Sequence, residues 1–217
     1  MRIFSNTSRR NNIHSALLLS CALVTLADSA SATNANIILN VATGTATWST
    51  PISGAATDLT KTGTGIAVLS GTNTYIGVTA ISGGTLELGA AVGLTAGAGD
   101  ITMADGTTLK STTAALSTGK AITLAGDGLI NAGTVAVTLS GIVTVTAGKH
   151  LEIKGSTVTL SGSNTWHSTK TLSIETTTLT PSNAASIASA SILVNDGTTI
   201  VLMDGITYAP TSLGIAP

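Results

Sequence analysis

After residue 33 the chain is a succession of short runs in which apolar residues alternate with polar or small ones. An alternation with a period of two is typical of strands that bury one side. Glycine-rich turns separate the runs, and no stripe of helical period lies between them. The clearest runs are residues 86–88, 101–103, 122–124, 135–139, 143–145, 151–153 and 158–160. The pattern predicts an all-β fold made of many short strands.

The runs belong to an internal repeat. Two hexapeptides, SGTNTY at 70–75 and SGSNTW at 161–166, are nearly identical and lie 91 positions apart. At the same spacing the tetrapeptide DGTT at 105–108 returns at 196–199. Because the spacing holds without a gap, chance is a poor explanation even in a chain rich in Ser, Thr and Gly. We therefore expect two copies of a 91-residue repeat, at about 59–109 and 150–200.

Short strands and a repeat together favour a parallel β-helix, a solenoid in which each inward position meets its equivalent one coil away. About four coils of some twenty residues fit one copy. A β-sandwich is the alternative, but it needs tight hairpin turns and a core usually anchored by aromatics, of which few are present. We expect the β-helix over residues 59–217, Thr or Asn ladders on its outside, and residues 33–58 as an N-terminal cap or lead-in with Trp48 over the first coil.

The N-terminus has the features of a signal peptide. Basic residues open it, residues 16–27 are mostly apolar, and Ala30 and Ala32 form a small-x-small cleavage pattern. We expect a signal peptide over residues 1–32 with cleavage near Ala32. The apolar stretch is too short for a transmembrane helix. A twin-arginine signal at residues 9–10 and a lipoprotein site at Cys21 fit the flanking residues less well.

Composition narrows the function classes. Cleavage removes Cys21, the one cysteine in the sequence, so disulfides would not hold the mature chain together. The net charge is −1 and 9% of residues are charged. Without a basic patch, we expect no nucleic-acid partner.

The residues that could carry chemistry are few and scattered. His150 and His167 lack the spacing of a metal site, and we expect both in solvated turns. Asp105 and Asp196 could be acids of a glycosidase or lyase, but about four coils separate them, and capping of their own turns accounts for them. We therefore expect no catalytic, cofactor or metal site and no enzyme activity. Tyr75 and Trp166 could stack on sugars, but their shared repeat position favours a packing role.

The region around the first hexapeptide resembles the passenger-associated transport repeat, also called the autotransporter-associated β-strand repeat. The residues that carry the resemblance are Lys61, Gly63, Gly65, Leu69, Ser70, Gly71, Asn73, Thr74, Tyr75, Gly77, Thr79, Ile81, Gly84 and Leu86. Ala67 departs from the pattern, where the family usually has Leu. The second copy is degenerate and keeps Leu160, Ser161, Gly162, Asn164, Thr165 and Trp166.

The resemblance implies a right-handed parallel β-helix that is exported by the Sec route to the surface of a Gram-negative bacterium, its outer membrane or the medium. It also implies passage through an outer-membrane translocator barrel, aided by the repeat, and cell-surface or host ligands. We expect an exported structural or adhesive protein, placed in the periplasm if it has no barrel partner. Two alternatives stay open: a β-helix carbohydrate-active enzyme, and a truncated passenger fragment. Unpaired strand edges at the solenoid ends favour self-association.

Overall fold

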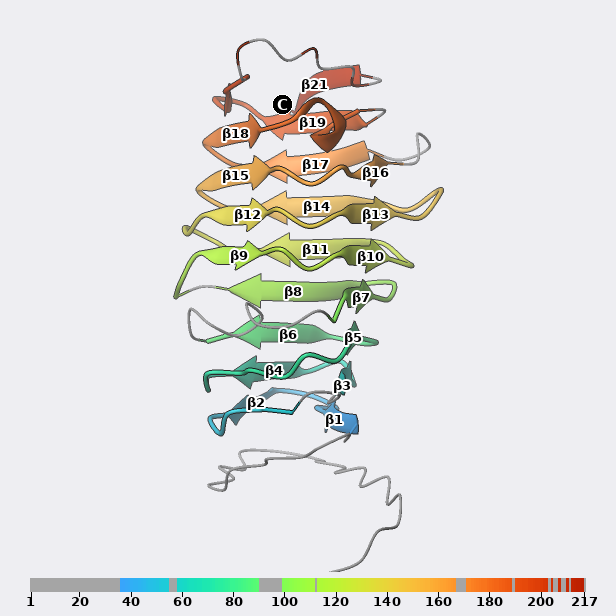
Figure 1. Ribbon diagram of the computed structural model, residues 1–217, viewed down its shortest axis with the longest axis vertical. Helices are drawn as coiled ribbons and strands as arrows, with labels where there is room; N and C mark the ends of the chain where they lie inside the picture. Colours follow the sequence, from blue (N-terminus) through green and yellow to red (C-terminus); the bar gives the residue numbers. More distant parts are fainter. Residues whose placement is uncertain are drawn as a thin grey trace, which may run out of the picture.

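The computed structural model describes residues 36–54, 58–89, 99–111, 113–166, 171–188, 190–202, 204, 207, 210 and 212–216. In these residues the chain is a solenoid whose strands form three parallel sheets of seven, nine and five strands (Figure 1). The expected signal peptide, with Ala30, Ala32 and Cys21, lies outside the described residues, as do His167 and Tyr208.

Each sheet takes one side of the coil. The seven-stranded sheet contains β1 (Asn36–Asn40), β3 (Asp58–Thr62), β5 (Thr79–Ile81), β7 (Ile101–Met103), β10 (Ile122–Leu124), β13 (Val143–Val145) and β16 (Thr165–Trp166). The nine-stranded sheet contains β2 (Thr45–Trp48), β4 (Ile66–Leu69), β6 (Thr85–Leu88), β8 (Thr107–Ser111), β11 (Gly128–Asn131), β14 (Leu151–Lys154), β17 (Thr171–Glu175), β19 (Ser191–Asn195) and β21 (Ser212–Ala216). The five-stranded sheet contains β9 (Leu116–Thr118), β12 (Val137–Leu139), β15 (Thr157–Leu160), β18 (Thr178–Pro181) and β20 (Thr199–Ile200). A 3₁₀ turn, η1 (Ala184–Ser186), precedes β19.

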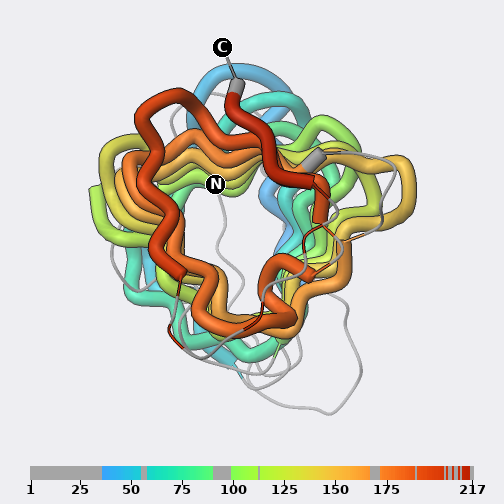
Figure 2. The backbone as a smooth tube through the Cα atoms, turned by 90° about the horizontal axis from the view of Figure 1, so that it is seen from above, coloured from blue at the N-terminus to red at the C-terminus, as the bar shows by residue number. Residues whose placement is uncertain are grey.

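The coil is right-handed, as the family resemblance implies. In Figure 1 the chain rises from β1 to β21, the more distant strands β11 and β14 point left, and the nearer strands β12 and β15 point right. Seen from above, successive coils superpose around one axis (Figure 2). The first corner joins the seven- to the nine-stranded sheet, the second joins the nine- to the five-stranded sheet, and the third returns to the seven-stranded sheet.

Most coils are 21 residues long. Ile101 pairs with Ile122 and Ile122 with Val143, each 21 positions further along. The shortest and longest steps, 19 and 23 residues, flank β6 on its two sides. A regular length is possible because glycine supplies the turn conformation: Gly63 and Gly84, on successive first corners, have φ of 76° and 63°.

Inward side chains stack in columns along the axis. One column of the seven-stranded sheet is Leu39, Lys61, Ile81, Met103, Leu124, Val145 and Trp166, all buried. Burial of a Leu, Ile or Met side chain contributes about 1.5–3 kcal/mol, so these columns hold the coils together. The column contains one charged member, Lys61, which the alternation alone did not predict to be buried.

The outer faces differ in charge. The seven-stranded sheet carries a threonine ladder: Thr102, Thr123, Thr144 and Thr165. The five-stranded sheet carries a second hydroxyl ladder: Ser117, Thr138, Thr159 and Thr180. The nine-stranded sheet carries the charges: Glu87, Lys110, Lys154 and Glu175 share one row. The expected outer threonine ladders are therefore present.

The solenoid begins earlier than the expected boundary at residue 59. Strands β1 and β2 pair in parallel with β3 and β4 and form the first coil. They lie in the 33–58 segment that was expected to be a cap. Trp48, at the end of β2, is a buried member of that coil. Within the described residues, no helix has the length and apolar character needed to cross a membrane.

Candidate functional site: the inward face of the repeat

The first hexapeptide is an extended segment between β4 and β5 that alternates in burial. Gly71, Asn73 and Tyr75 are buried, whereas Ser70 and Thr74 are exposed. Backbone bonds such as Thr74 N to Ile52 O, 2.8 Å, tie it to the coil below. The segment occupies the third side of its coil, and it places a glycine, an amide and an aromatic ring inside the solenoid.

Asn73 joins two coils through its side chain. Its Oδ1 accepts a hydrogen bond from the backbone N–H of Ile52, one coil earlier, at 2.9 Å. Its Nδ2 donates to the carbonyl of Gly71 at 3.0 Å. Both bonds are buried, and an unpaired buried polar group costs about 1–3 kcal/mol. Asn73 therefore fixes the position of this segment against the coil below.

Tyr75 packs in the core with a polar partner. Its side chain is 2% exposed, and its hydroxyl hydrogen-bonds the Oγ1 of Thr79 at 2.8 Å. Burial raises the pKa of Tyr75 to about 12, and the bond to Thr79 acts in the opposite direction. The ammonium of Lys120 lies 5.9 Å from the ring centroid, within cation–π range. Tyr75 is thus a packing residue, with no face free to stack on a sugar.

Lys61 binds the first corner from inside. It is 0% exposed, and its Nζ donates to the carbonyls of Thr62, Gly63 and Gly83 at 2.7, 2.8 and 3.0 Å. Gly83 belongs to the next coil, so Lys61 also links two coils. Burial lowers the pKa of Lys61 and of Lys120, and Lys120 donates in the same manner to the carbonyl of Gly99 at 2.7 Å. The lysine of the repeat motif is a buried donor to turn carbonyls.

The other motif residues fall on the turns and the strands. Gly63, Gly65 and Gly84 lie in first-corner turns, and Gly77 precedes β5. The buried strand positions are Leu69, Thr79, Ile81 and Leu86 in the first copy and Leu160 in the second.

The second copy repeats the contacts of the first. Asn164 Oδ1 accepts from Val143 N at 2.8 Å, one coil earlier, and its Nδ2 donates to the carbonyl of Ser186 at 2.9 Å, one coil later. Trp166 is buried and its Nε1 donates to the same carbonyl at 3.0 Å. Ser161 N donates to Leu139 O at 3.0 Å, as Ser70 N donates to Trp48 O at 2.9 Å. The two copies therefore perform the same task.

The two copies nevertheless lie on different sides of the solenoid. Leu69 is in β4 of the nine-stranded sheet, but Leu160 is in β15 of the five-stranded sheet. Ile101 is in β7 of the seven-stranded sheet, but Ile192 is in β19 of the nine-stranded sheet. A spacing of 91 is four coils of 21 residues and one third of another, so the second copy is advanced by one side. The motif works on any side because all three sides are parallel strands that face one core.

The DGTT turns differ from the expected self-capping. Gly106 and Gly197 have positive φ, 69° and 81°, as such a turn requires. Asp105 Oδ1, however, accepts from the backbone N–H of Asp127 in the next coil at 2.8 Å, so it bridges two coils. The first turn lies at the first corner and the second at the second corner, a further separation beyond the four coils expected. Asp105 and Asp196 are not brought together.

Two other carboxylates do line one groove. Glu152 and Glu175 lie on the outer face of the nine-stranded sheet, in a groove of about 210 Å³. Lys154 lies between them, with its Nζ 3.1 Å from Glu152 Oε1 and 2.8 Å from Glu175 Oε2. These contacts raise the pKa of Lys154, that with Glu175 most. Sequence reasoning missed this group because its members pair across coils. A shared lysine holds both acids ionised, which does not favour the protonated acid that glycoside chemistry needs.

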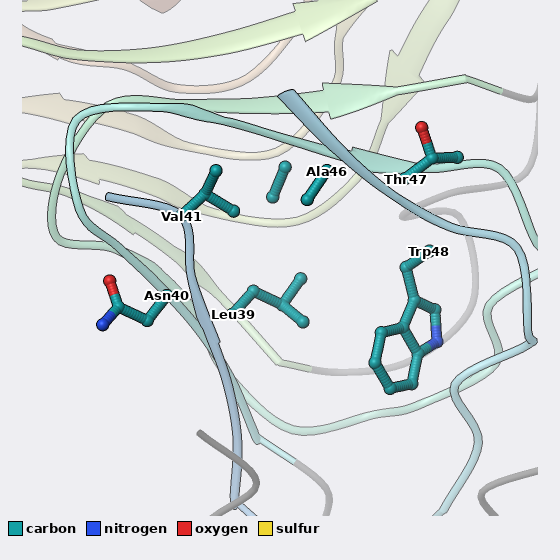
Figure 3. A pocket seen from close by; sticks show the side chains of 7 residues that line it. Leu39, Asn40, Val41, Ala46, Thr47 and Trp48 are labelled. Carbon is teal, nitrogen blue, oxygen red and sulfur yellow. The ribbon is translucent and has the colours of Figure 1, made fainter. Parts of the chain in front are cut away.

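Neither a metal site nor a ligand cavity is formed by the described residues. No cluster of three or more His, Cys, Asp or Glu side chains occurs in the described ranges. His150 lies in a loop before β14, and its backbone N–H donates to Asp127 Oδ1 at 2.8 Å. At the N-terminal end a cavity of about 10 Å³ is lined by apolar side chains that include Leu39, Val41 and Trp48 (Figure 3). That volume is at the lower limit for a single water.

Comparison with known proteins agrees with the motif. Residues 59–88 match the sequence model of the passenger-associated-transport-repeat family. No curated protein and no solved structure matches the chain. The matched segment runs from β3 to the end of β6 and contains the first hexapeptide, Lys61 and the first-corner glycines. Residues 59–88 of this right-handed β-solenoid are a passenger-associated transport repeat, which confirms the resemblance found in the sequence.

Proposed function

We propose that the protein is an exported structural and adhesive surface protein of a Gram-negative bacterium, built like an autotransporter passenger. The match over residues 59–88 carries this proposal. Its support is that the coils above continue the same fold with the same 21-residue step. The repeat is thus one part of a continuous passenger-like solenoid.

The repeat copies would aid folding and export by joining coils. Asn73 connects its segment to the coil below, and Asn164 connects three successive coils. A chain that crosses a membrane unfolded must stack its coils afterwards, and stability in a solenoid comes from contacts between neighbouring coils. Buried side-chain bonds between coils fix the register of stacking. Each copy would therefore act as a point from which neighbouring coils order.

Adhesion would use the uncharged faces. The threonine ladder at Thr102, Thr123, Thr144 and Thr165 repeats every coil, at a spacing of about 4.8 Å. A flat, neutral row of hydroxyls fits an uncharged, hydroxyl-rich ligand such as a surface polysaccharide. We propose no catalysis, since the two acids that share a groove both bind Lys154.

Export tests the first part. The full chain is expressed in a Gram-negative host with a translocator barrel, and folded protein at the surface is quantified by protease resistance. Replacing the inward residues Gly71, Asn73 and Tyr75 together should lower the folded yield at the surface. The matched control replaces the outward neighbours Ser70, Thr72 and Thr74 with Ala and should behave as wild type. Equal yields from both triple variants would contradict the proposed role.

Adhesion tests the second part. Cells that display the protein are assayed for attachment to polysaccharide-coated surfaces. Thr123→Lys with Thr144→Lys places charge on the neutral face and should reduce attachment. The control Lys110→Gln with Lys154→Gln alters the charged face and should leave attachment unchanged. Attachment that follows the lysines of the nine-stranded sheet instead would assign adhesion to the charged face.

A further inference from the structure

The C-terminal end of the solenoid is open. Strand β21 pairs with β19 along one edge, and no further strand pairs with its other edge among the described residues. Its inward residues Leu213 and Ile215 are 54% and 69% exposed, although Ile192 and Val194, their partners one coil below, are each 2% exposed. The core columns of the nine-stranded sheet therefore end at the surface.

The N-terminal end is closed by comparison. Ile37, Leu39 and Trp48, the inward residues of the first coil, are all buried. A head-to-tail filament would need both ends open, because it joins the last coil of one copy to the first coil of the next. The structure offers an apolar end on the C-terminal side alone, so an open end finds its complement in another copy of itself.

The edge of β21 lacks the features that prevent pairing. Its sequence, Ser-Leu-Gly-Ile-Ala, contains no charged residue and no proline. Exposed edges usually carry lysine, proline or a bulge to block association. Two further exposed apolar side chains of the last coil, Val201 and Leu202, extend the surface. Two such ends meet without like-charge repulsion.

We propose that two copies of this chain associate through their C-terminal ends, with the two β21 strands pairing antiparallel about a two-fold axis. Inward faces coincide when residues of the same parity are opposite each other, since side chains alternate along a strand. The register centred on Gly214 meets this condition and pairs all five residues of β21. It places Leu213 of each copy opposite Ile215 of the other, so four apolar side chains form a shared core.

The outward positions of β21 allow this register. Ser212 and Gly214 alternate with the apolar pair, and Gly214 lies opposite itself on the axis. One strand pair and a few side chains form an interface at the small end of the range for specific association. We therefore expect a weak dimer, with a Kd of about 1–100 µM. The inference does not rest on export or adhesion.

Sedimentation equilibrium on the purified full chain, from about 1 µM to 1 mM, tests the dimer. Wild type should pass from monomer to dimer in this range. Ile215→Lys buries a charge in the shared core and should shift the transition to at least tenfold higher concentration. The control Thr123→Lys, on the exposed threonine ladder, should leave it unchanged. A monomer at every concentration, or a dimer that both lysine variants affect equally, would overturn the proposal.

Cross-linking tests the register and remains informative if Ile215→Lys misfolds. In a Cys21→Ser background, Gly214→Cys places one thiol of each copy across the axis and should give a covalent dimer under mild oxidation. A Cβ at position 214 meets Leu193 Cδ1 at 3.4 Å, which is ordinary contact, so the fold tolerates it. Thr123→Cys should stay monomeric under the same oxidation. Equal cross-linking of the two variants would rule out the β21 pairing.

Discussion

Polar side chains inside the core do most of the joining between coils at the scale of single residues. Lys61 and Asn73 satisfy backbone groups of neighbouring coils, and Tyr75 finds Thr79 within its own. In an apolar column each would be costly if its bonds were lost. The motif therefore specifies which coils stack and in what register, beyond what interchangeable aliphatic columns specify.

The first prediction concerns the two amides. Asn73→Ala leaves the Ile52 N–H buried without its partner, and Asn164→Ala does the same to Val143 and also frees the Ser186 carbonyl from one donor. Each variant should lower the free energy of unfolding by about 1–3 kcal/mol, with Asn164→Ala the more severe. Urea unfolding measures both. Thr74→Ala, an exposed neighbour, is the control, and a loss as large there would show that the amides are not special.

The second prediction is a pH dependence carried by Tyr75. The folded protein holds the Tyr75 proton up to a pKa of about 12, whereas an unfolded tyrosine loses it near its ordinary value of 10.0. Between these values the unfolded state binds fewer protons, so stability falls as pH rises, by up to about 1.4 kcal/mol per pH unit. Below pH 10 the contribution is fully present.

Tyr75→Phe isolates this effect. The variant lacks the hydroxyl bond to Thr79 and should be about 1 kcal/mol less stable at pH 7. It also lacks the alkaline loss, so the gap should close between pH 10 and 12. Lys61 and Lys120 are present in both proteins, and their titration cancels in the difference. Urea unfolding at pH 7, 10 and 11 provides the comparison, and parallel stability curves would contradict a raised pKa for Tyr75.

At the scale of strands and corners, close backbone approach limits the sequence. A Cβ built on Gly162 would lie 2.0 Å from the carbonyl oxygen of Gly141, and one on Gly141 would lie 2.1 Å from that of Lys120. These residues occupy successive third corners, 21 positions apart. A side chain at either glycine would force two coils apart, so the corner requires the absence of a Cβ there.

The third prediction follows from that distance. Gly162→Ala should destabilise the protein by about 1–3 kcal/mol or more, because backbone must move to admit the methyl group. Gly119→Ala is the matched control, since its Cβ meets Ser140 Oγ at 3.5 Å and nothing closer. The control should be neutral or slightly stabilising through reduced freedom of the unfolded chain. Thermal unfolding of the two variants is the measurement, and equal midpoints would contradict the steric argument.

Several strands and the solenoid itself were predictable from the sequence for one physical reason. Period-two alternation reports which side chains face the core, and it marked runs such as Val143 to Val145 and Val158 to Leu160 correctly. Alternation does not report a polar residue that faces inward, so Lys61 and Asn73 were recognised as motif residues without a location. It also does not report on which side a run lies.

The advance of the second copy by one side illustrates that limit. The repeat spacing of 91 was plain in the sequence, but the coil length of 21 becomes visible only when strands are paired. A spacing that is not a whole number of coils moves the motif around the axis. The candidate site consequently consists of two separate inward clusters, and the groove of Glu152 and Glu175 depends on cross-coil pairing that no local pattern encodes.

At the scale of the whole molecule, a solenoid has stability that varies along its axis. Each coil contacts only its neighbours, so an inner coil is held from two sides and an end coil from one. The middle coils, with β10, β11 and β12, have fully buried inward residues such as Ile122, Ile130 and Val137. The last coil has Leu213 and Ile215 exposed. Opening should therefore begin at the C-terminal end and move inward.

Native-state hydrogen exchange tests this gradient as the fourth prediction. At low protein concentration, where a C-terminal dimer would dissociate, amides of β21 should exchange with the smallest opening free energy and amides of β10 to β12 with the largest. Near a Kd of tens of micromolar, raising the concentration to ten times that value should protect β21 by up to about 1.4 kcal/mol and leave β10 unchanged. Uniform protection from β1 to β21 would instead mean that the solenoid opens as one unit, because a single cooperative transition exposes every amide together.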